Sequence, residues 1–323
     1  MKPQTSRRTR AAVLLAAATL PLAAGTLDTT AAQADSTVNK VVVLGFDGAL
    51  YAKIQESGAP NLLKLATQGT VGQTSIAPHA TDSIPIWATA LTGVWDTKHH
   101  ITSFDGDAFA TYPTVFTQLE KAKPQLRTES VVTWSALADA AASGNPNVDV
   151  NVVASDPNVA DSATADRAAA AVTEDAPDFL FVDFDSVDSA GHKGSAKPGY
   201  LDAITKADAG VGKIVNAIDA RAAAHPKERW TILVTTGTGN KPQGGHGGQS
   251  AEETANFVIA RGPGFAAGAT NGRFSIVDIT PTVLTLLGVA VPSGLDGTSM
   301  VTATPPPVSG SSALLPGTGS FNP

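Results

Sequence analysis

The sequence predicts an α/β fold in which a mostly parallel central sheet carries helices on both faces. Short runs rich in β-branched and apolar residues alternate with longer Ala/Leu-rich stretches of helical period. Each short run is apolar without alternation, which is typical of a strand buried on both faces of a parallel sheet. The chain is long enough to build one large domain around a substantial core.

The elements follow in order along the chain. The apolar runs predict strands at 40–46, 129–134, 179–184, 231–235 and 257–260. The helical patterns predict helices at 60–68, 83–91, 114–121, 162–174, 199–222 and 279–287. In open parallel sheets, ligands bind beyond the carboxyl ends of the strands. The polar residues that follow three of these strands are Asp47, then Asp185 and Asp188, then the run from Thr236, and we expect them to share a site.

The N-terminus is typical of an export signal. Basic residues precede an apolar stretch at 11–24, and Ala32-Gln33-Ala34 offers a small-x-small cleavage site. We therefore expect a signal peptide at 1–34 and a mature, secreted chain from Asp35. Arg7 and Arg8 leave the twin-arginine route open beside the general secretory route.

The expected domain covers 35–301, and a flexible Pro/Gly/Ser-rich tail covers 302–323. No segment is long and apolar enough to predict a membrane span. The chain has no cysteine, which excludes thiolate metal sites and cysteine nucleophiles. Its net charge is −7, with no Lys/Arg cluster outside the N-terminal segment, so no nucleic-acid-binding surface is expected.

Two residues follow predicted strands or begin predicted helices in positions suited to chemistry. Asp47 ends a buried strand beside Gly48, where a carboxylate needs a hydrogen bond, an ion pair or a metal. Its alternative role is that of an ordinary turn residue. Ser83 stands where a helix begins, with Pro85 in the first turn, and is either a nucleophile facing a bound phosphoryl group or a helix cap.

A second set of residues suits a metal ion. Asp188 and His192 are four residues apart and can converge on one ion if they share a helical turn or flank a tight loop. His246 stands within Gly244-Gly245-His246-Gly247-Gly248, a loop shaped by glycines. One Asp and two His form a three-ligand zinc set with an open fourth position. The alternative is surface histidines on a plain flexible loop.

In their order along the chain and in their residues, these motifs resemble those of the alkaline phosphatase superfamily, especially its nucleotide pyrophosphatase/phosphodiesterase-like branch. The matching pieces are Gly45-Phe46-Asp47-Gly48, Ser83-x-Pro85 with Leu91-Thr92-Gly93 and His99, Asp188-x-x-Gly191-His192, Gly245-His246-Gly247-Gly248, and the ending from Asp278 to Gly297. The resemblance spans about residues 41–300. It implies that Asp188, His192 and His246 hold one zinc ion, that Asp47 and Ser83 face a second metal, and that Ser83 attacks phosphorus.

The chain departs from the family at the second metal. The family has an Asp-His pair where this sequence has Gly237-Thr238. The resemblance with this gap implies one zinc ion, with the second site in doubt. Lys241 is a candidate for a compensating charge, and Asp82, Asp183 and Asp185 are spare carboxylates nearby.

The resulting expectation is a secreted, metal-dependent hydrolase of phosphate mono- or diesters that uses Ser83 as nucleophile at an altered or single-metal site. Its partner would be a small phosphorylated or otherwise anionic substrate. The alternative is a catalytically impaired pseudoenzyme that binds an anionic ligand. A sulfatase is a further alternative, although the sulfatase motif has Arg where this chain has Trp87. We expect the loops at 99–112 and 135–161 to set specificity.

Overall fold

The computed structural model describes residues 37–153 and 160–301. The expected signal peptide at 1–34 and tail at 302–323 lie outside the described residues. No helix within 37–153 or 160–301 combines the length and the apolar character that a bilayer crossing requires.

A single sheet runs through the described part of the chain, in the order β4-β3-β5-β1-β6-β7-β2-β8. Five neighbouring strands are parallel: β4 (Val150–Val153), β3 (Thr128–Val132), β5 (Phe179–Phe184), β1 (Val38–Phe46) and β6 (Glu228–Thr235). β7 (Ala255–Arg261) is antiparallel to β6, and β2 (Thr70–Ser75) is antiparallel to β7 and parallel to β8 (Ala269–Thr270). The prediction of a mostly parallel sheet is confirmed.

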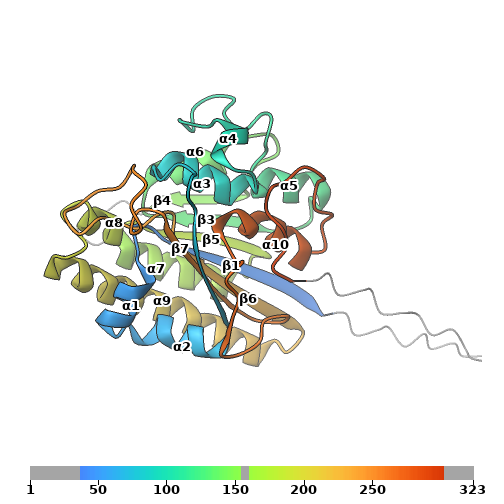
Figure 1. The fold of residues 1–323 in the computed structure, drawn as a ribbon. Helices are drawn as coiled ribbons and strands as arrows, with labels where there is room; N and C mark the ends of the chain where they lie inside the picture. Colours follow the sequence, from blue (N-terminus) through green and yellow to red (C-terminus); the bar gives the residue numbers. More distant parts are fainter. Residues whose placement is uncertain (1–36, 154–159, 302–323) are drawn as a thin grey trace, which may run out of the picture. The chain divides into compact units, whose positions relative to one another are not determined.

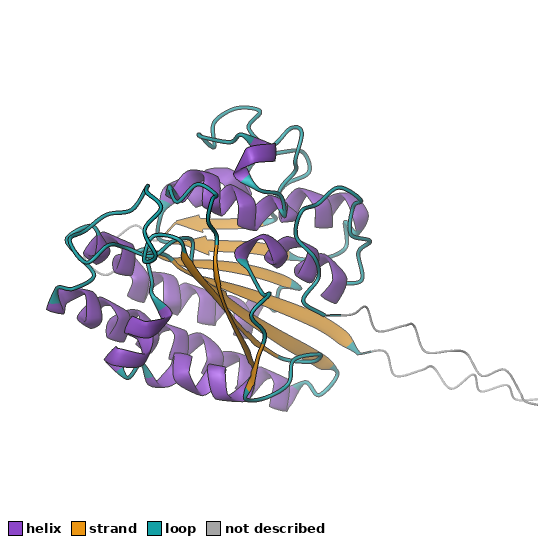
Figure 2. Cartoon of the chain, in the orientation of Figure 1, coloured by secondary structure: helices purple, strands orange, loops and turns teal. Residues whose placement is uncertain are grey.

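Helices cover both faces of the sheet (Figures 1 and 2). One face carries α1 (Tyr51–Ser57), α2 (Pro60–Gln68), α7 (Ala160–Ala170) and α9 (Pro198–Ala224). The other carries α3 (Ser83–Thr92), α5 (Val115–Ala122), α6 (Ser135–Ala141) and α10 (Ile279–Leu286). Because alternate strand residues point to opposite faces, Val42, Leu44 and Phe46 of β1 enter one core, whereas Val41 and Val43 enter the other.

The remaining elements are short. α4 (Asp96–His99) and α8 (Ser186–Gly191) follow α3 and β5, a π-helical turn at Ala171–Asp175 extends α7, and a 3-10 turn at Ile276–Asp278 precedes α10. All five predicted strands and all six predicted helices are present, with β5 and α2 at the predicted boundaries. The segment 135–161 is not the loop that was expected, because α6 and β4 lie within it and 154–159 lies outside the described residues.

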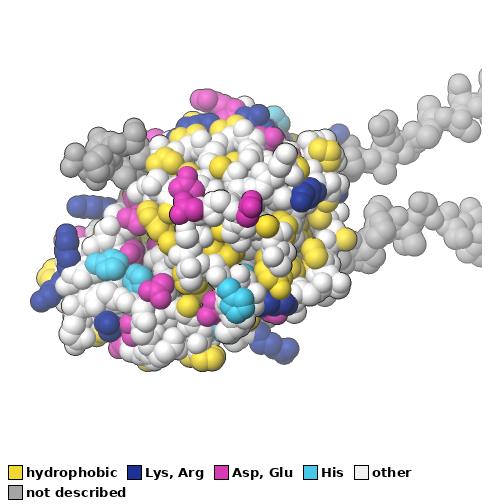
Figure 3. Space-filling view, turned by 90° about the horizontal axis from the view of Figure 1, so that it is seen from above, with side chains coloured by type: hydrophobic (Ala, Val, Ile, Leu, Met, Phe, Trp, Pro, Cys, Tyr) yellow, Lys and Arg dark blue, Asp and Glu magenta, His cyan; other side chains and the backbone are white. Residues whose placement is uncertain are grey.

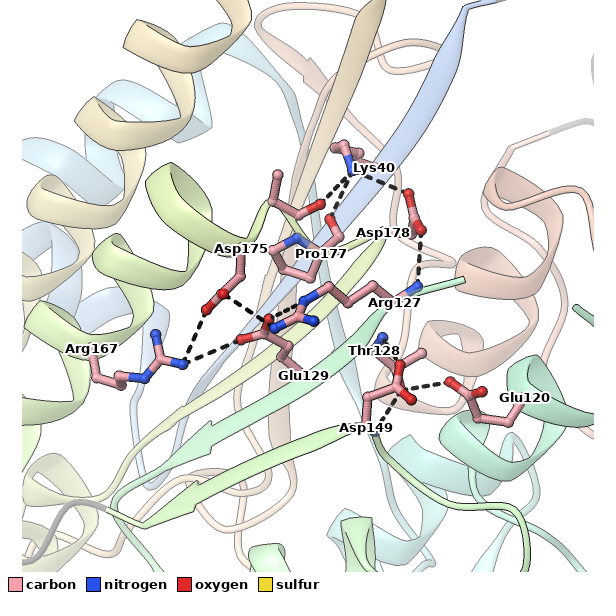
Figure 4. A network of polar contacts seen from close by, with 11 residues as sticks. Lys40, Glu120, Arg127, Thr128, Glu129, Asp149, Arg167, Asp175, Pro177 and Asp178 are labelled. Atoms are coloured by element: carbon pink, nitrogen blue, oxygen red, sulfur yellow. Dashed lines mark hydrogen bonds and ion pairs between the residues drawn. The ribbon is translucent and has the colours of Figure 1, made fainter. Parts of the chain in front are cut away.

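The amino ends of the central strands are joined by a network of ion pairs and hydrogen bonds between side chains (Figure 4). Lys40 Nζ lies 3.1 Å from Asp178 Oδ1, and the other oxygen of Asp178 accepts a hydrogen bond from the Arg127 backbone N–H. Arg127 Nε lies 2.8 Å from Oε1 of the buried Glu129, whose pKa is raised by burial. These contacts lie at the amino ends of the parallel strands. The polar residues at the opposite, carboxyl ends take no part in them and remain available for a site.

The N-terminus of α2 is capped from a different helix. Asp208, a buried residue of α9, accepts hydrogen bonds at Oδ1 from the Leu62 N–H (2.7 Å) and at Oδ2 from the Asn61 N–H (3.2 Å). Its carboxylate also meets the positive end of the α2 dipole. The residue before α2, Ala59, supplies no side-chain cap, so this long-range contact takes over the capping role.

We therefore expect Asp208→Ala to lower the free energy of unfolding by about 2–3 kcal/mol, because two backbone donors lose their charged acceptor. Urea unfolding followed by circular dichroism measures the change. Asp202→Ala is the matched control, because Asp202 lies on the exposed side of the same helix. Equal stability of the two variants would contradict the capping role.

Candidate metal centre and nucleophile

The predicted site residues gather at the carboxyl ends of β1, β5 and β6. Asp47 follows β1, Asp185 and Asp188 follow β5, and Thr236 follows β6. These three strands are neighbours in the sheet and run parallel, so their ends meet at one edge. Histidine and acidic side chains lie side by side on the face seen in Figure 3.

α8 brings Asp188 and His192 together. The helix begins directly after β5, and the backbone N–H of His192 donates to the Asp188 carbonyl at 2.8 Å, so the two residues stand one turn apart. Their side chains face each other, with His192 Nε2 3.1 Å from Asp188 Oδ2. Of the two geometries that the spacing allows, a helical turn and a tight loop, the structure has the helical turn.

His246 approaches the same carboxylate from the glycine-rich loop. Gly244, Gly245 and Gly247 have φ values of 117°, 75° and 105°, a conformation that residues with a Cβ rarely adopt. His246 Nε2 lies 3.4 Å from Asp188 Oδ1, and the ring lies 5.0 Å from that of His192 between centroids. Asp188, His192 and His246 thus offer three ligand atoms within 4.8 Å of one another.

Hydrogen bonds orient two of these three side chains. His246 Nδ1 lies 2.8 Å from the Thr81 carbonyl oxygen, which can only accept, so Nδ1 carries the proton and Nε2 keeps its lone pair in the neutral ring. This Nε2 is buried and has no hydrogen-bond partner among the described residues. The adjacent carboxylate of Asp188 raises the pKa of His246, so a proton and a cation compete for this nitrogen.

Asn240 orients Asp188, the second of these two side chains, and was not anticipated from the sequence. It is fully buried, and its Nδ2 donates to Asp188 Oδ1 at 2.8 Å and to the Gly48 carbonyl at 3.3 Å. Burial alone would raise the pKa of Asp188, but the contacts with His246 and Asn240 lower it below its ordinary value. No local pattern marks Asn240, because it stands in a polar stretch after β6 and its partners come from β1 and α8.

Asp47 has partners of its own. It is buried, Oδ1 accepts from the Gly48 N–H at 2.9 Å, and Oδ2 accepts from Trp87 Nε1 at 2.9 Å. Burial and the nearby Asp188 raise the pKa of Asp47 to about 7, although the indole hydrogen bond acts in the opposite direction. Asp47, Asp185 and Asp188 form a second group whose oxygens lie within 4.8 Å of one another.

Ser83 is the first residue of α3 and not its cap, because the capping position is Asp82. It is half-buried, and its hydroxyl makes no hydrogen bond to any residue that the structure describes. A cavity of about 400 Å³ opens beside it, lined by Asp82, Ser83, Ile84, Pro85, Thr102 and Trp134. The hydrogen bond from the Gly247 N–H to Thr81 Oγ1 (3.1 Å) ties the start of α3 to the loop of His246.

The residues that could compensate for the missing second-metal ligands differ in their surroundings. Lys241 Nζ lies 3.4 Å from Glu253 Oε1, so this cation has a carboxylate partner of its own. Asp82 is exposed, whereas Asp183 is fully buried and burial raises its pKa well above the ordinary value. Asp185 lies close enough to Asp47 and Asp188 to share a cation with them.

The donors therefore form one group with two imidazoles and a carboxylate and a second group of carboxylates alone, and the family's ligands at 237 and 238 are missing beside the second group. Asp188, His192 and His246 present one carboxylate and two imidazoles, a combination that suits zinc or a similar ion. At the second position, both Asp47 oxygens already accept hydrogen bonds. A Cβ at Gly237 would lie 2.8 Å from Asp47 Oδ1 and 3.1 Å from Trp87 Nε1, so a ligand-bearing side chain fits there only if these two side chains shift.

Sequence comparison places this chain in a known family. The family model described as type I phosphodiesterase / nucleotide pyrophosphatase matches residues 41–236, more than half of the chain. The matched stretch includes Asp47, Ser83, Asp188 and His192, and it ends immediately before Gly237. A 2,3-bisphosphoglycerate-independent phosphoglycerate mutase from Chloroflexus aggregans is 30% identical over 140 residues, which are 41% of this chain but only 24% of the mutase.

Solved structures show the same fold. Murine ectonucleotide pyrophosphatase/phosphodiesterase 5, solved in complex with AMP as an inactive variant, superimposes with a TM-score of 0.64 at 15% identity, covering 79% of this chain and 96% of that one. A 2-O GAG sulfatase gives a TM-score of 0.61 at 13% identity, covering 82% and 73%. The chain belongs to the type I phosphodiesterase/nucleotide pyrophosphatase family, within the alkaline phosphatase superfamily of hydrolases.

Proposed function

We propose that this chain is a metal-dependent hydrolase of small phosphate mono- or diesters that works with a single ion. The observation that carries the proposal is the buried His246 Nε2, which has no hydrogen-bond partner among the described residues and faces the carboxylate of Asp188. A buried nitrogen that faces a carboxylate is costly unless a proton or a cation completes it. An ion held by Asp188, His192 and His246 supplies that partner.

Zinc is the ion that best suits these donors. Two imidazoles and a carboxylate leave a fourth tetrahedral position open, as in catalytic zinc sites. A bound zinc ion would act as a Lewis acid on a phosphoryl oxygen. Asn240 and the Thr81 carbonyl keep the Asp188 carboxylate and the His246 ring in place for that ion.

Ser83 is the proposed nucleophile. Its unpaired hydroxyl stands at the N-terminus of α3, where the free backbone N–H groups and the helix dipole favour a phosphoryl oxygen. Attack by Oγ would form a bond to phosphorus and break the bond to the leaving ester oxygen, which would take up the serine proton; water would then hydrolyse the phosphate ester on Ser83. The half-buried position beside the cavity leaves Ser83 accessible to a small substrate.

A second candidate function is binding of an anionic ligand without turnover. It is favoured by the hydrogen bond from Trp87 to Asp47, because a neutral indole at this position cannot lower the pKa of a serine hydroxyl as a cation would. The two candidates share the metal and the ligand class. They differ only in whether Ser83 reacts.

The first prediction concerns the metal. Purified protein should bind about one zinc ion per chain, and His246→Ala should weaken binding by more than ~100-fold because a direct ligand is lost. Asn240→Ala should weaken it by about 10–100-fold, since Asp188 loses its orienting partner. Zinc titration against a chromophoric chelator measures both. His225→Ala, at an exposed histidine, should bind as wild type does, and unchanged affinity in His246→Ala would refute the assignment.

The second prediction concerns the nucleophile. With zinc present, Ser83→Ala should lower turnover of 4-nitrophenyl phosphate or bis(4-nitrophenyl) phosphate by at least ~100-fold. Ser57→Ala is the control, because its hydroxyl only bonds the Ile54 carbonyl within α1. Equal turnover of wild type and Ser83→Ala would exclude the nucleophilic role. Zinc-loaded wild type that binds these esters without turning them over would favour the second candidate.

A further inference from the structure

We propose that the indole of Trp87 closes the second-metal position of this family and that Trp87 and Gly237 form one interlocked pair. The pair sets the chain to hold a single ion, and restoring the missing ligands alone would not reopen the position. The inference rests on the proposed function only in taking Asp188, His192 and His246 as the site of that single ion.

The first step is the occupancy of Asp47. Its carboxylate is the one ligand of the second position that the chain retains from a strand end. Trp87 Nε1 donates to Oδ2 and the Gly48 N–H donates to Oδ1, both at 2.9 Å. Each oxygen of this carboxylate thus already accepts a hydrogen bond from a donor that a cation would have to displace or avoid.

The second step is the rigidity of Trp87. Its side chain is fully buried and packs edge-on against Phe181, with ring centroids 5.9 Å apart and an interplanar angle of 82°. The ring crosses β1 at Gly45, where an added Cβ would lie 2.7 Å from Cη2. The indole therefore fills the space that a side chain at Gly45 would occupy, and it is held there by the packed core. It cannot turn away from Asp47 unless the surrounding core side chains repack.

The third step is Gly237. An added Cβ would meet Asp47 Oδ1 at 2.8 Å, Trp87 Nε1 at 3.1 Å and Ile86 Cγ2 at 3.2 Å. The backbone has little freedom to withdraw. Asn256 Nδ2 donates to the Thr236 carbonyl at 2.7 Å, and Thr236 Oγ1 accepts from the Ala49 N–H at 3.1 Å. The tightest of these contacts is with Asp47 Oδ1, and the indole of Trp87 both holds that carboxylate by its hydrogen bond and lies against the same added Cβ. A side chain at 237 therefore requires Asp47 and Trp87 to shift together.

One competing arrangement uses the same residues. The oxygens of Asp47, Asp185 and Asp188 lie close enough to hold a cation without residue 237. If such an ion binds, the wild-type chain takes up two metals, and the proposed closure by Trp87 is wrong. Metal stoichiometry therefore belongs in the test.

The first arm of the experiment is a double-mutant cycle on stability, which needs no metal. Gly237→Ala should lower the melting temperature by roughly 3–10 °C through overpacking. In a Trp87→Phe background, which lacks Nε1, the loss caused by Gly237→Ala should be less than half as large. Gly272→Ala is the control, because its added Cβ meets nothing within 4 Å. Equal losses in both backgrounds, or a loss no larger than that of Gly272→Ala, would overturn the interlock.

The second arm counts zinc in chelator-treated, reloaded protein. The variant that carries Gly237→Asp and Thr238→His should bind no more zinc than wild type, whereas adding Trp87→Leu should admit about one further ion per chain. Melting curves confirm that each variant folds. Closure by Trp87 would be contradicted by a second zinc ion in the variant with Gly237→Asp and Thr238→His. It would also be contradicted if the folded variant that adds Trp87→Leu gained no ion. Wild type without any zinc refutes the proposed function and leaves the stability cycle as the test of the interlock.

Discussion

The arrangement of the site depends on the need of the buried Asp47 carboxylate for a partner. A carboxylate at the end of a central strand is costly without a cation or strong donors. Here the donors are the Gly48 N–H and the Trp87 indole. That choice has consequences along the chain, since Trp87 needs Gly45 beneath it and Gly237 beside it. The departure from the family at Gly237-Thr238 is therefore connected with the packing of Trp87 against Asp47 and Gly45 and is not an isolated loss of ligands.

The neighbouring cluster is supported independently of Asp47. Asp188 and His192 are fixed by one turn of α8, Asn240 holds the Asp188 carboxylate, and the Thr81 carbonyl fixes the tautomer of His246. The loop of His246 and the start of α3 are joined through Thr81 and Gly247, so Ser83 and the three-ligand cluster share a common support. One half of the family's site is therefore well ordered by hydrogen bonds, while the other half is closed by an aromatic ring.

Periodicity and spacing were enough to predict the core of the fold. β5 and α2 were predicted at their true boundaries from the apolar run of β5 and the helical period of α2, and the i,i+4 spacing of Asp188 and His192 allowed the shared turn that the structure has. β2 and β4 were missed because these strands lie away from the centre of the sheet and their segments, Thr70–Ser75 and Val150–Val153, carry polar residues. The antiparallel direction of β7 and the roles of Trp87 and Asn240 depend on contacts between residues far apart in sequence, which local patterns do not encode.

The central claim is that this site holds one ion, between Asp188, His192 and His246, while the Trp87 indole takes the place of the second. The most direct test is a crystal structure of zinc-soaked protein with anomalous data collected at the zinc edge. A single anomalous peak at the three-ligand cluster, with Trp87 Nε1 still hydrogen-bonded to Asp47, is the predicted result. A second peak at Asp47, or no peak among Asp188, His192 and His246, would contradict it.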